Sequence, residues 1–485
     1  PVPPRPKTRP EARDLLQQPM PLIAAALDMV GIAAVIFLER KNPASTLAWI
    51  MVLLFLPFVG FAAYMAFSSG FPVHKKKRFN AKAARDALYD QYLVKYLNIP
   101  PAHERRKHAP PSPTLRLINY LDREGDGIYT PLNNADIFHN GEDMFASLKS
   151  DLRGAQKHIH LLYYIFRNDA LGREILDILV QKARQGVEVR LMYDGLGSLR
   201  WFSRMFAELK KAGGQVQPFS PILFNLSPHI RLNFRNHRKL TVIDGQIGYI
   251  GGMNVGEEYL GRKKRLSPWR DTHLRLSGAS VWFLQERFLM DWLHGKKQDP
   301  GPADLVRFFP PPLFDQRRDS LGVQIVSSGP DTQEQAPIKS GLMAMIYNSV
   351  TETLIQTPYF TPDDSFMDAL RIAAGAGVDV KLMLPGRGDH GTAILHRACK
   401  RGGARRDGRF EVGGGGGIAE GERREPSRGF EPAKLLDRIR KAVGARRDHH
   451  QHGGPRTRLE SEDHLWPRAA WIFGPGRADH RAAGP

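Results

Sequence analysis

Four polar residues between positions 237 and 254 are of types that could act on a phosphate. His237 and Lys239 are separated by one residue, and Asp244 and Asn254 follow them. The run 240–243 is aliphatic and β-branched, so we expect a strand on which His237 and Lys239 point the same way. A lysine ammonium would neutralise phosphate charge, while an imidazole beside it could attack phosphorus or move a proton. Asn254, after a turn, could add an amide donor to a phosphate oxygen.

Each of these residues also has an ordinary structural interpretation. A single His-x-Lys is usually a half-exposed strand face, Asp244-Gly245 is a common hairpin turn, and an isolated asparagine is usually a loop residue. The combination at this spacing is much harder to explain without a shared function. We therefore take the four residues together as a candidate active site.

The same spacing, His237-x-Lys239-x4-Asp244-x6-Gly251-x2-Asn254, resembles the signature of the phospholipase D superfamily. Within this superfamily, the segments NHRKLTVIDG, WRDTHLRLSG and QTPYFTPDD resemble those of bacterial cardiolipin synthases. The resemblance implies a duplicated α/β fold that contributes one motif from each half, and catalysis without a metal or other cofactor. One histidine of the pair would form a phosphohistidine, and the other would protonate the leaving alkoxide and activate the incoming alcohol.

This resemblance also implies a role for each matched residue. His237 would be the nucleophile or its acid/base counterpart, and the motif alone does not say which. Lys239 and Asn254 would bind the phosphate. Asp244 would hold the local fold and the orientation of the imidazole.

The composition favours an anionic partner. The 485 residues carry a formal charge of +20, and the pI is about 10.0. The single cysteine, Cys399, excludes an intrachain disulfide. No Cys/His cluster has zinc spacing, and the glycine run 413–417 lacks the Lys-Ser/Thr of a phosphate-binding loop.

Two apolar segments predict a membrane anchor over residues 21–67, after a basic disordered arm over 1–20. Residues 21–38 and 46–67 are close to the ~20 residues that a spanning helix needs. Basic residues precede the first segment and follow the second at 74–78, so both ends should lie in the cytoplasm. We expect a multi-pass protein of the bacterial inner membrane with a cytoplasmic catalytic body. The segment ERKNPASTLAWIMVLLFLPFVGF also resembles the N-terminal membrane module of cardiolipin synthases.

After a basic connector over 68–130, the chain predicts a first α/β domain over 131–300. Apolar runs at 159–166 and 187–193 are typical of buried strands, and a helical pattern at 172–185 separates them. This alternation indicates a parallel or mixed sheet covered by helices.

A proline-rich linker over 301–321 leads to a partial second domain over 322–398. Strands at 353–360 and 377–384 flank a helix at 365–376, which repeats the first half. The expected fold class is therefore α/β: two transmembrane helices, then a duplicated phospholipase D-like α/β/α sandwich whose second half is incomplete. The active site should lie between the halves, across a pseudo-twofold axis.

Three tyrosines lie at the ends of the matched strands. Tyr164 and Tyr359 are candidates for contacts with the lipid substrate at the site entrance, together with Tyr163. Core packing is the alternative role for at least one of the three.

The second half departs from the family pattern, because no second His-x-Lys-x4-Asp follows residue 384. His390 and His396 have no lysine two positions on. Over 399–485 the sequence becomes rich in Arg, Gly, His, Asp and Pro, which fits a disordered basic tail, a divergent domain or an out-of-frame translation. We favour the frame shift, since the change falls in mid-domain. With half of the duplicated site missing, the chain as written should be inactive or nearly so, and rescue by homodimerisation is open in principle.

The family resemblance implies transfer of a phosphatidyl group from one phosphatidylglycerol to the terminal hydroxyl of another, with release of glycerol. The expected partners are phosphatidylglycerol and other anionic membrane lipids, and a homo-oligomer is left open. A phospholipase D-type hydrolase is one alternative, and a catalytically dead protein that binds acidic lipid is another. The basic charge also suggests a nuclease, but the predicted membrane helices argue against a nucleic-acid partner.

Overall fold

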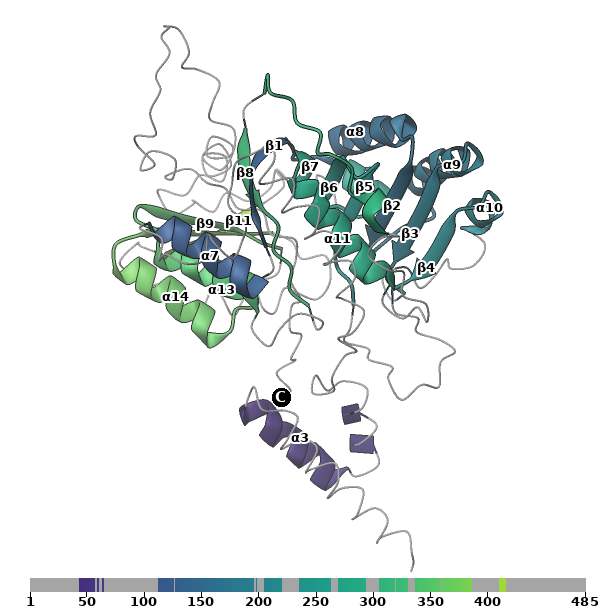
Figure 1. Ribbon diagram of the computed structural model, residues 1–485. Coiled ribbons are helices and arrows are strands. Elements are labelled where there is room, and N and C mark those ends of the chain that lie inside the picture. Colours follow the sequence, from purple (N-terminus) through teal and green to yellow (C-terminus); the bar gives the residue numbers. More distant parts are fainter. Residues whose placement is uncertain are drawn as a thin grey trace, which may run out of the picture.

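The computed structural model describes residues 43–56, 59–60, 63–64, 112–125, 127–195, 198, 205–219, 235–262, 269–293, 305–318, 320–329, 336–358, 360–385 and 410–415. Within these ranges the chain forms an N-terminal helix, an eight-stranded mixed sheet and a three-stranded parallel sheet (Figure 1). The two sheets form the centres of two α/β units.

The eight-stranded sheet has the order β4-β3-β2-β5-β6-β7-β1-β8. The pairs β2–β3 and β3–β4 are parallel, and all the other pairs are antiparallel. Its strands are Tyr129–Phe138 (β1), His158–Tyr163 (β2), Glu188–Tyr193 (β3), Gln215–Pro218 (β4), Leu240–Ile243 (β5), Ile247–Gly251 (β6), His273–Gly278 (β7) and Leu321–Gln324 (β8).

Helices cover both faces of this sheet, as Figure 1 shows. Alternate residues of β2 enter different cores: Ile159 and Leu161 pack with α8 and α9, while Leu162 packs with α11. The α/β sandwich expected for the first half is therefore confirmed. The covering helices are Gly141–Gly154 (α8), Ala170–Arg184 (α9), Ala207–Lys211 (α10) and Ser280–Leu293 (α11), with 3-10 turns at Glu257–Leu260 (η2) and Val306–Phe308 (η3).

The strand of the motif is shorter than expected. Its ladder with β2 begins at the pair Leu162–Leu240, so His237 and Lys239 lie in an extended segment just before β5. The ladder ends there because β2 itself ends at Tyr163, and the ring of Tyr164 then lies against the segment instead of a paired backbone. The expectation that both side chains stand on the strand is therefore corrected.

The second unit repeats the β-α-β pattern of the first. It consists of Pro337–Tyr347 (α13), Glu352–Gln356 (β9), Asp364–Gly375 (α14), Asp379–Pro385 (β10) and Phe410–Gly415 (β11), with the strand order β11-β10-β9. A small core that includes Leu370 and Val380 joins α14 to the sheet. Strand β11 lies within the 399–485 tail, and its residues pair in parallel with β10.

The boundary between the units differs from the one expected at residue 322. Strand β8 pairs with β1 and is the edge of the first sheet, so the second unit begins after Gln324. Conversely, helix α7 (Pro113–Gly125), within the expected connector, packs on α13, where Leu121 fits against Gly341. The two units are thus connected in two places: by the chain that leaves β8, and by the packing of α7 on α13.

Helix α3 (Pro43–Phe55) is the described part of the expected membrane anchor. Its side chains are largely apolar and exposed, including Leu47 and Leu54, while Trp49 packs edge-on against Tyr64 at 5.3 Å. No helix within the described ranges combines the length and the apolar character needed to cross a bilayer. The expected span 21–38 lies outside the described residues.

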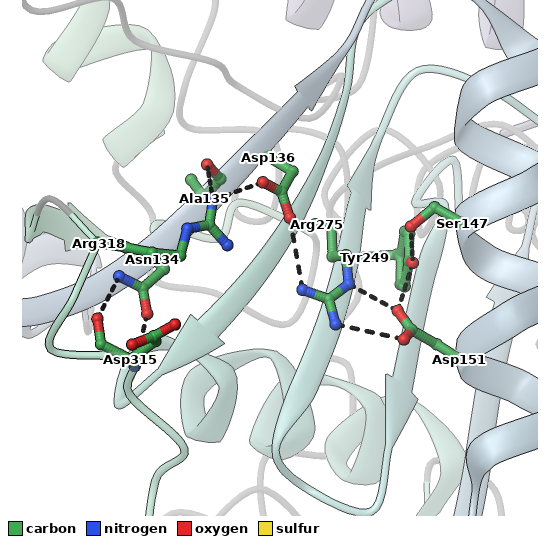
Figure 2. Close-up of polar contacts among 9 residues, drawn as sticks. All are labelled: Asn134, Ala135, Asp136, Ser147, Asp151, Tyr249, Arg275, Asp315 and Arg318. Atoms are coloured by element: carbon green, nitrogen blue, oxygen red, sulfur yellow. Dashed lines mark hydrogen bonds and ion pairs between the residues drawn. The ribbon is translucent and has the colours of Figure 1, made fainter. Parts of the chain in front are cut away.

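A network of charged groups ties the outer elements of the first unit together (Figure 2). Arg275 on β7 donates to both carboxylate oxygens of Asp151 on α8, at 2.6 and 3.2 Å, and its Nη1 donates to Asp136 on β1 at 3.4 Å. Arg318 donates to the other oxygen of Asp136, and Tyr249 donates to Asp151 at 2.5 Å. These contacts do not involve the motif segment, and they link helix α8 to strands β1, β6 and β7.

Candidate active site

Five strand ends meet at one edge of the first sheet. Strands β2, β3 and β6 end there, and β5 and β7 begin there because they run antiparallel to β2 and β6. The segments at this edge carry Tyr164, Asp194, His237, Lys239, Asn254, Asp271 and His273. The fold therefore collects polar side chains that are far apart in the sequence.

His237 and Lys239 are in direct contact at this edge. Lys239 Nζ lies 3.2 Å from His237 Nδ1 and donates to the His237 carbonyl at 2.6 Å. The ring of Tyr164 lies 4.6 Å from the His237 ring, and Lys239 Nζ lies 5.3 Å from the centre of the Tyr164 ring. The side chain of Lys239 is buried, while His237 keeps part of its surface accessible although the surrounding protein shields much of its ring. The pair presents one accessible imidazole above a nearly inaccessible amine.

The environment of the pair favours neutral forms. Burial, and secondly the adjacent Lys239 ammonium, lower the pKa of His237 to about 3, so its imidazole is neutral near pH 7. Burial lowers the pKa of Lys239 to about 7, although the Asp271 and Asp194 carboxylates oppose this change. A neutral imidazole retains the lone pair that a nucleophile or general base requires. An anionic ligand beside Lys239 would raise its pKa again and hold the ammonium form.

Asp244 acts at the opposite end of β5 from His237. It takes a positive φ of 53° in a turn with Gly245, and its carboxylate accepts from the backbone N–H groups of Gln156, Lys157 and His158 at 2.7–2.9 Å. These bonds tie the β5–β6 turn to the start of β2, which supports the expected role in the local fold. The described contacts of Asp244 do not include the His237 imidazole, and the two residues lie beyond opposite ends of β5.

Asn254 is buried at the site edge and is engaged by the protein. Its Oδ1 accepts from Ile165 N at 3.0 Å, and its Nδ2 donates to the Tyr259 hydroxyl at 2.7 Å. An amide nitrogen carries two hydrogens, so one donor is left for a phosphate oxygen. The structure thus gives Asn254 a framework role in addition to the phosphate contact predicted from the sequence.

Two carboxylates at this edge were not singled out from the sequence. Asp194 follows β3, is buried, and accepts from Asn236 N at 2.9 Å. Asp271 precedes β7, and Gly252 leaves room for its carboxylate, because a Cβ there would lie 2.1 Å from Asp271 Oδ1. Both act on the charge of Lys239. The sequence could have pointed to these two aspartates through their positions at the ends of predicted strands, because the ends of neighbouring strands meet at one edge of a sheet.

His273 is a second histidine beneath the site. It is fully buried under Gly251, and neither ring nitrogen has a hydrogen-bond partner among the described residues. Burial, and secondly the charge of Lys239, lower its pKa to about 3. His273 therefore adds a neutral ring below the lysine, where a protonated one would repel the ammonium.

The three tyrosines predicted at the strand ends have different outcomes. Tyr163 is a core residue whose hydroxyl lies 3.1 Å from Thr241 Oγ1. Tyr164 lies against His237 and Lys239. Tyr359 lies outside the described residues. Core packing is thus confirmed for one of them, as the alternative interpretation required.

No group of three or more His, Cys, Asp or Glu side chains that could hold a metal ion occurs in the described part of the chain. The arrangement at the edge suits nucleophilic or acid/base catalysis on an anionic phosphorus centre, with an accessible neutral imidazole above a lysine that a bound anion would hold in its ammonium form.

The mixed sheet covered by helices, with this histidine–lysine pair at its edge, defines a phospholipase D-like domain. The family profile described as "Cardiolipin synthase, PLD-like domain" matches residues 148–265, and one described as "Phospholipase_D-nuclease N-terminal" matches residues 26–68.

Relatives identify the family more narrowly. The chain is 41% identical over 358 residues to a cardiolipin synthase of Oceanobacillus iheyensis, covering 74% of this chain and 72% of the relative. It is 40% identical over 359 residues to the major cardiolipin synthase ClsA of Bacillus subtilis, covering 73% and 72%. A cardiolipin synthase of Listeria innocua is 39% identical over 379 residues, covering 78% and 76%. The chain belongs to the cardiolipin synthase family.

Proposed function

We propose that the chain transfers a phosphatidyl group from one phosphatidylglycerol to the terminal hydroxyl of a second, giving cardiolipin and glycerol. The contact between a neutral, exposed His237 and a buried Lys239 carries this proposal. The similarity to named cardiolipin synthases supports the choice of substrate. Phosphatidylglycerol and other anionic lipids are the proposed partners.

The anionic phosphate would bind beside Lys239 and Asn254. The lysine ammonium would turn from His237 Nδ1 to a phosphate oxygen, since a charge-assisted bond to phosphate is stronger than a bond to a neutral ring. The imidazole could then carry its proton on Nδ1 and present the Nε2 lone pair to phosphorus. Tyr164 would keep the ring in place from one side.

In the first step, a bond forms between His237 Nε2 and phosphorus while the bond from phosphorus to the glycerol oxygen breaks, and an acid protonates the leaving oxygen. In the second step, the hydroxyl of another phosphatidylglycerol attacks phosphorus, gives up its proton to the same group, and the nitrogen–phosphorus bond breaks. This order makes His237 the nucleophile, and the exchange of roles with an acid/base histidine is the alternative assignment.

The acid at the other apex has no second motif to supply it in this sequence. A group from the second unit or from a second copy of the chain must therefore serve, or the chain is inactive as written. The frame-shift interpretation of the tail makes a further prediction: another reading frame across codons 385–485 would encode a second His-x-Lys-x4-Asp.

The proposed location is the bacterial inner membrane, with helix α3 in the anchor and the α/β units on the cytoplasmic side. The exposed apolar surface of α3 supports contact with lipid. The proposed domain limits are those predicted from the sequence, except that the second unit begins after Gln324.

The test is turnover of labelled phosphatidylglycerol in vesicles by the full chain and by His237→Ala, with products identified by mass spectrometry. Cardiolipin and glycerol in equal amounts, absent with the variant, are expected. Phosphatidic acid without cardiolipin would establish the hydrolase instead. Vesicle binding that is unchanged in the variant, with no product from either protein, would establish the dead lipid-binding protein, and cleavage of DNA would establish the nuclease.

A further inference from the structure

The segment 235–239, which carries His237, belongs to no strand and is held from two sides by buried carboxylates. On one side, Asn236 N donates to Asp194 Oδ2 at 2.9 Å. On the other side, Asn236 Nδ2 donates to Asp291 Oδ2 on helix α11 at 2.7 Å. Asp194 and Asp291 are 1% and 2% exposed. The residue just before His237 is therefore anchored through both its backbone and its side chain.

The residue just after His237 is anchored to the same helix carboxylate. Arg238 Nη1 lies 3.3 Å from Asp291 Oδ2, and Arg238 N donates to Asn236 Oδ1 at 3.2 Å. One turn earlier on α11, Arg287 donates through Nε at 3.1 Å and through Nη2 to Asp291 Oδ1. The Asp291 carboxylate thus holds both residues that flank His237, and a second guanidinium fixes the carboxylate.

Arg238 extends this clamp to the second unit. Its Nη2 donates to the Ser328 carbonyl at 3.0 Å, and the Ser328 hydroxyl accepts from Ile338 N at 3.2 Å, in the first turn of α13. The position of His237 is therefore linked, through two described hydrogen bonds, to the unit that should supply the other half of the site.

We propose that Asp291 is a positioning residue for His237, which sets the line of attack on phosphorus without contacting the substrate. This inference rests on the proposed phosphatidyl transfer. Its physical basis is that the carboxylate makes charge-assisted bonds to the residues on both sides of His237, in a segment that belongs to no strand. A displacement of about 1 Å at a reacting group can lower a rate by about 10²-fold.

The experiment compares Asp291→Asn with Asp151→Asn in the full chain. Asp151 is a matched control, because it is also a shielded aspartate that accepts from an arginine, yet its partners lie in the separate network of Figure 2. Three quantities are measured: thermal unfolding, kcat and KM for phosphatidylglycerol, and the rate at which diethyl pyrocarbonate modifies His237 as a function of pH.

Both variants should lower Tm. Only Asp291→Asn should lower kcat, by about 10- to 100-fold with KM changed less than threefold, and only it should alter the pH profile of His237 modification. Equal kcat values and equal His237 profiles in the two variants would overturn the proposal and leave Asp291 a purely structural residue.

Two further points keep the test decisive. If Asp291→Asn does not fold, Arg238→Gln replaces it, because Arg238 is partly exposed and makes contacts with both Asp291 and Ser328; an unchanged His237 profile in that variant overturns the proposal. If the wild-type chain makes no cardiolipin, the proposed function fails, but the modification profile still decides whether Asp291 positions His237.

Discussion

In both α/β units, a pair of parallel strands flanks a helix that begins at an aspartate cap and ends just before a glycine with positive φ. Asp169 caps α9 and Asp363 caps α14. Gly186 has a φ of 89° and Gly377 a φ of 97°. Each glycine turns the chain from the helix into the next strand, a conformation that costs other residues energy. The repeat seen in the sequence is thus a repeat of local geometry.

The units differ beside the first strand of each pair. Strand β4 lies next to β3, and β11 lies next to β10, so these outer positions correspond. On the other side, β2 is paired with the motif strand β5, whereas no strand of the described residues pairs with β9 on that side. The comparison teaches that the β-α-β repeat is a scaffold, and that the added β5–β6 hairpin converts one of its edges into a candidate site.

The largest expected effect is the loss of His237. His237→Asn should reduce cardiolipin formation by on the order of 10⁴-fold or more, as for a nucleophile that acts in a concerted set. His390→Asn and His396→Asn, in the second half, should leave turnover within about twofold if these residues supply no acid. Product formation in vesicles measures all three, and a comparable loss in either second-half variant would break the comparison by making that residue part of the site.

The next effect concerns a lysine from each unit. Lys239→Met should lower turnover by about 10²-fold or more, because it removes the cation beside the phosphate. Lys381, on β10, pairs with Asp379 at a partly exposed position, so Lys381→Met should change turnover little and stability by less than about 1 kcal/mol.

The same two variants should also differ in how their stability depends on pH. The folded pKa of Lys239, about 7, lies below its ordinary value, so the unfolded state binds more protons between these two values. Wild-type stability should therefore rise from pH 7 towards pH 10, and below pH 7 the full cost of the buried charge, up to about 5 kcal/mol, should be present. Lys239→Met should remove this slope and Lys381→Met should keep it, as measured by denaturant unfolding. A wild-type curve that is flat in this range would contradict the burial of the amine.

A smaller effect distinguishes the helix caps. Asp363→Ala should cost about 1 kcal/mol, the usual value of an N-cap side chain, because its ion pair with Lys339 is largely exposed and contributes little. Asp169→Ala should cost about 2 kcal/mol, because Asp169 Oδ2 also accepts from Glu257 N at 2.8 Å and so ties α9 to η2. Chemical denaturation followed separately for the two units measures both. Equal costs would show that the second bond contributes nothing.

The smallest effect should be equal in the two units. Gly186→Ala and Gly377→Ala meet no neighbouring atom within 4 Å, so each should cost only the strain of positive φ, about 1 kcal/mol. Hydrogen exchange of β3 and β10 reports each change locally. A clearly larger cost in one unit would show that the repeat is less exact than the dihedral angles indicate.

Several features of the fold followed from local sequence alone. The strands before and after α9 and the second copy around α14 rest on periodicity and on Gly at helix ends. The short ladder of β5, the place of β8 in the first sheet and the strand β11 did not follow, because each depends on a pairing partner far away in the chain.

The sequence by itself determined which side chains could perform the chemistry, since His237, Lys239 and Asn254 are set by type and spacing. Only the tertiary structure decided what surrounds them. Burial lowers the pKa values of His237 and Lys239. The carboxylates of Asp271 and Asp194 come from other strand ends, and Asp291 on helix α11 holds the segment. The physical reason is that desolvation and anchoring depend on the packing of elements far apart in the chain, which residue spacing does not contain.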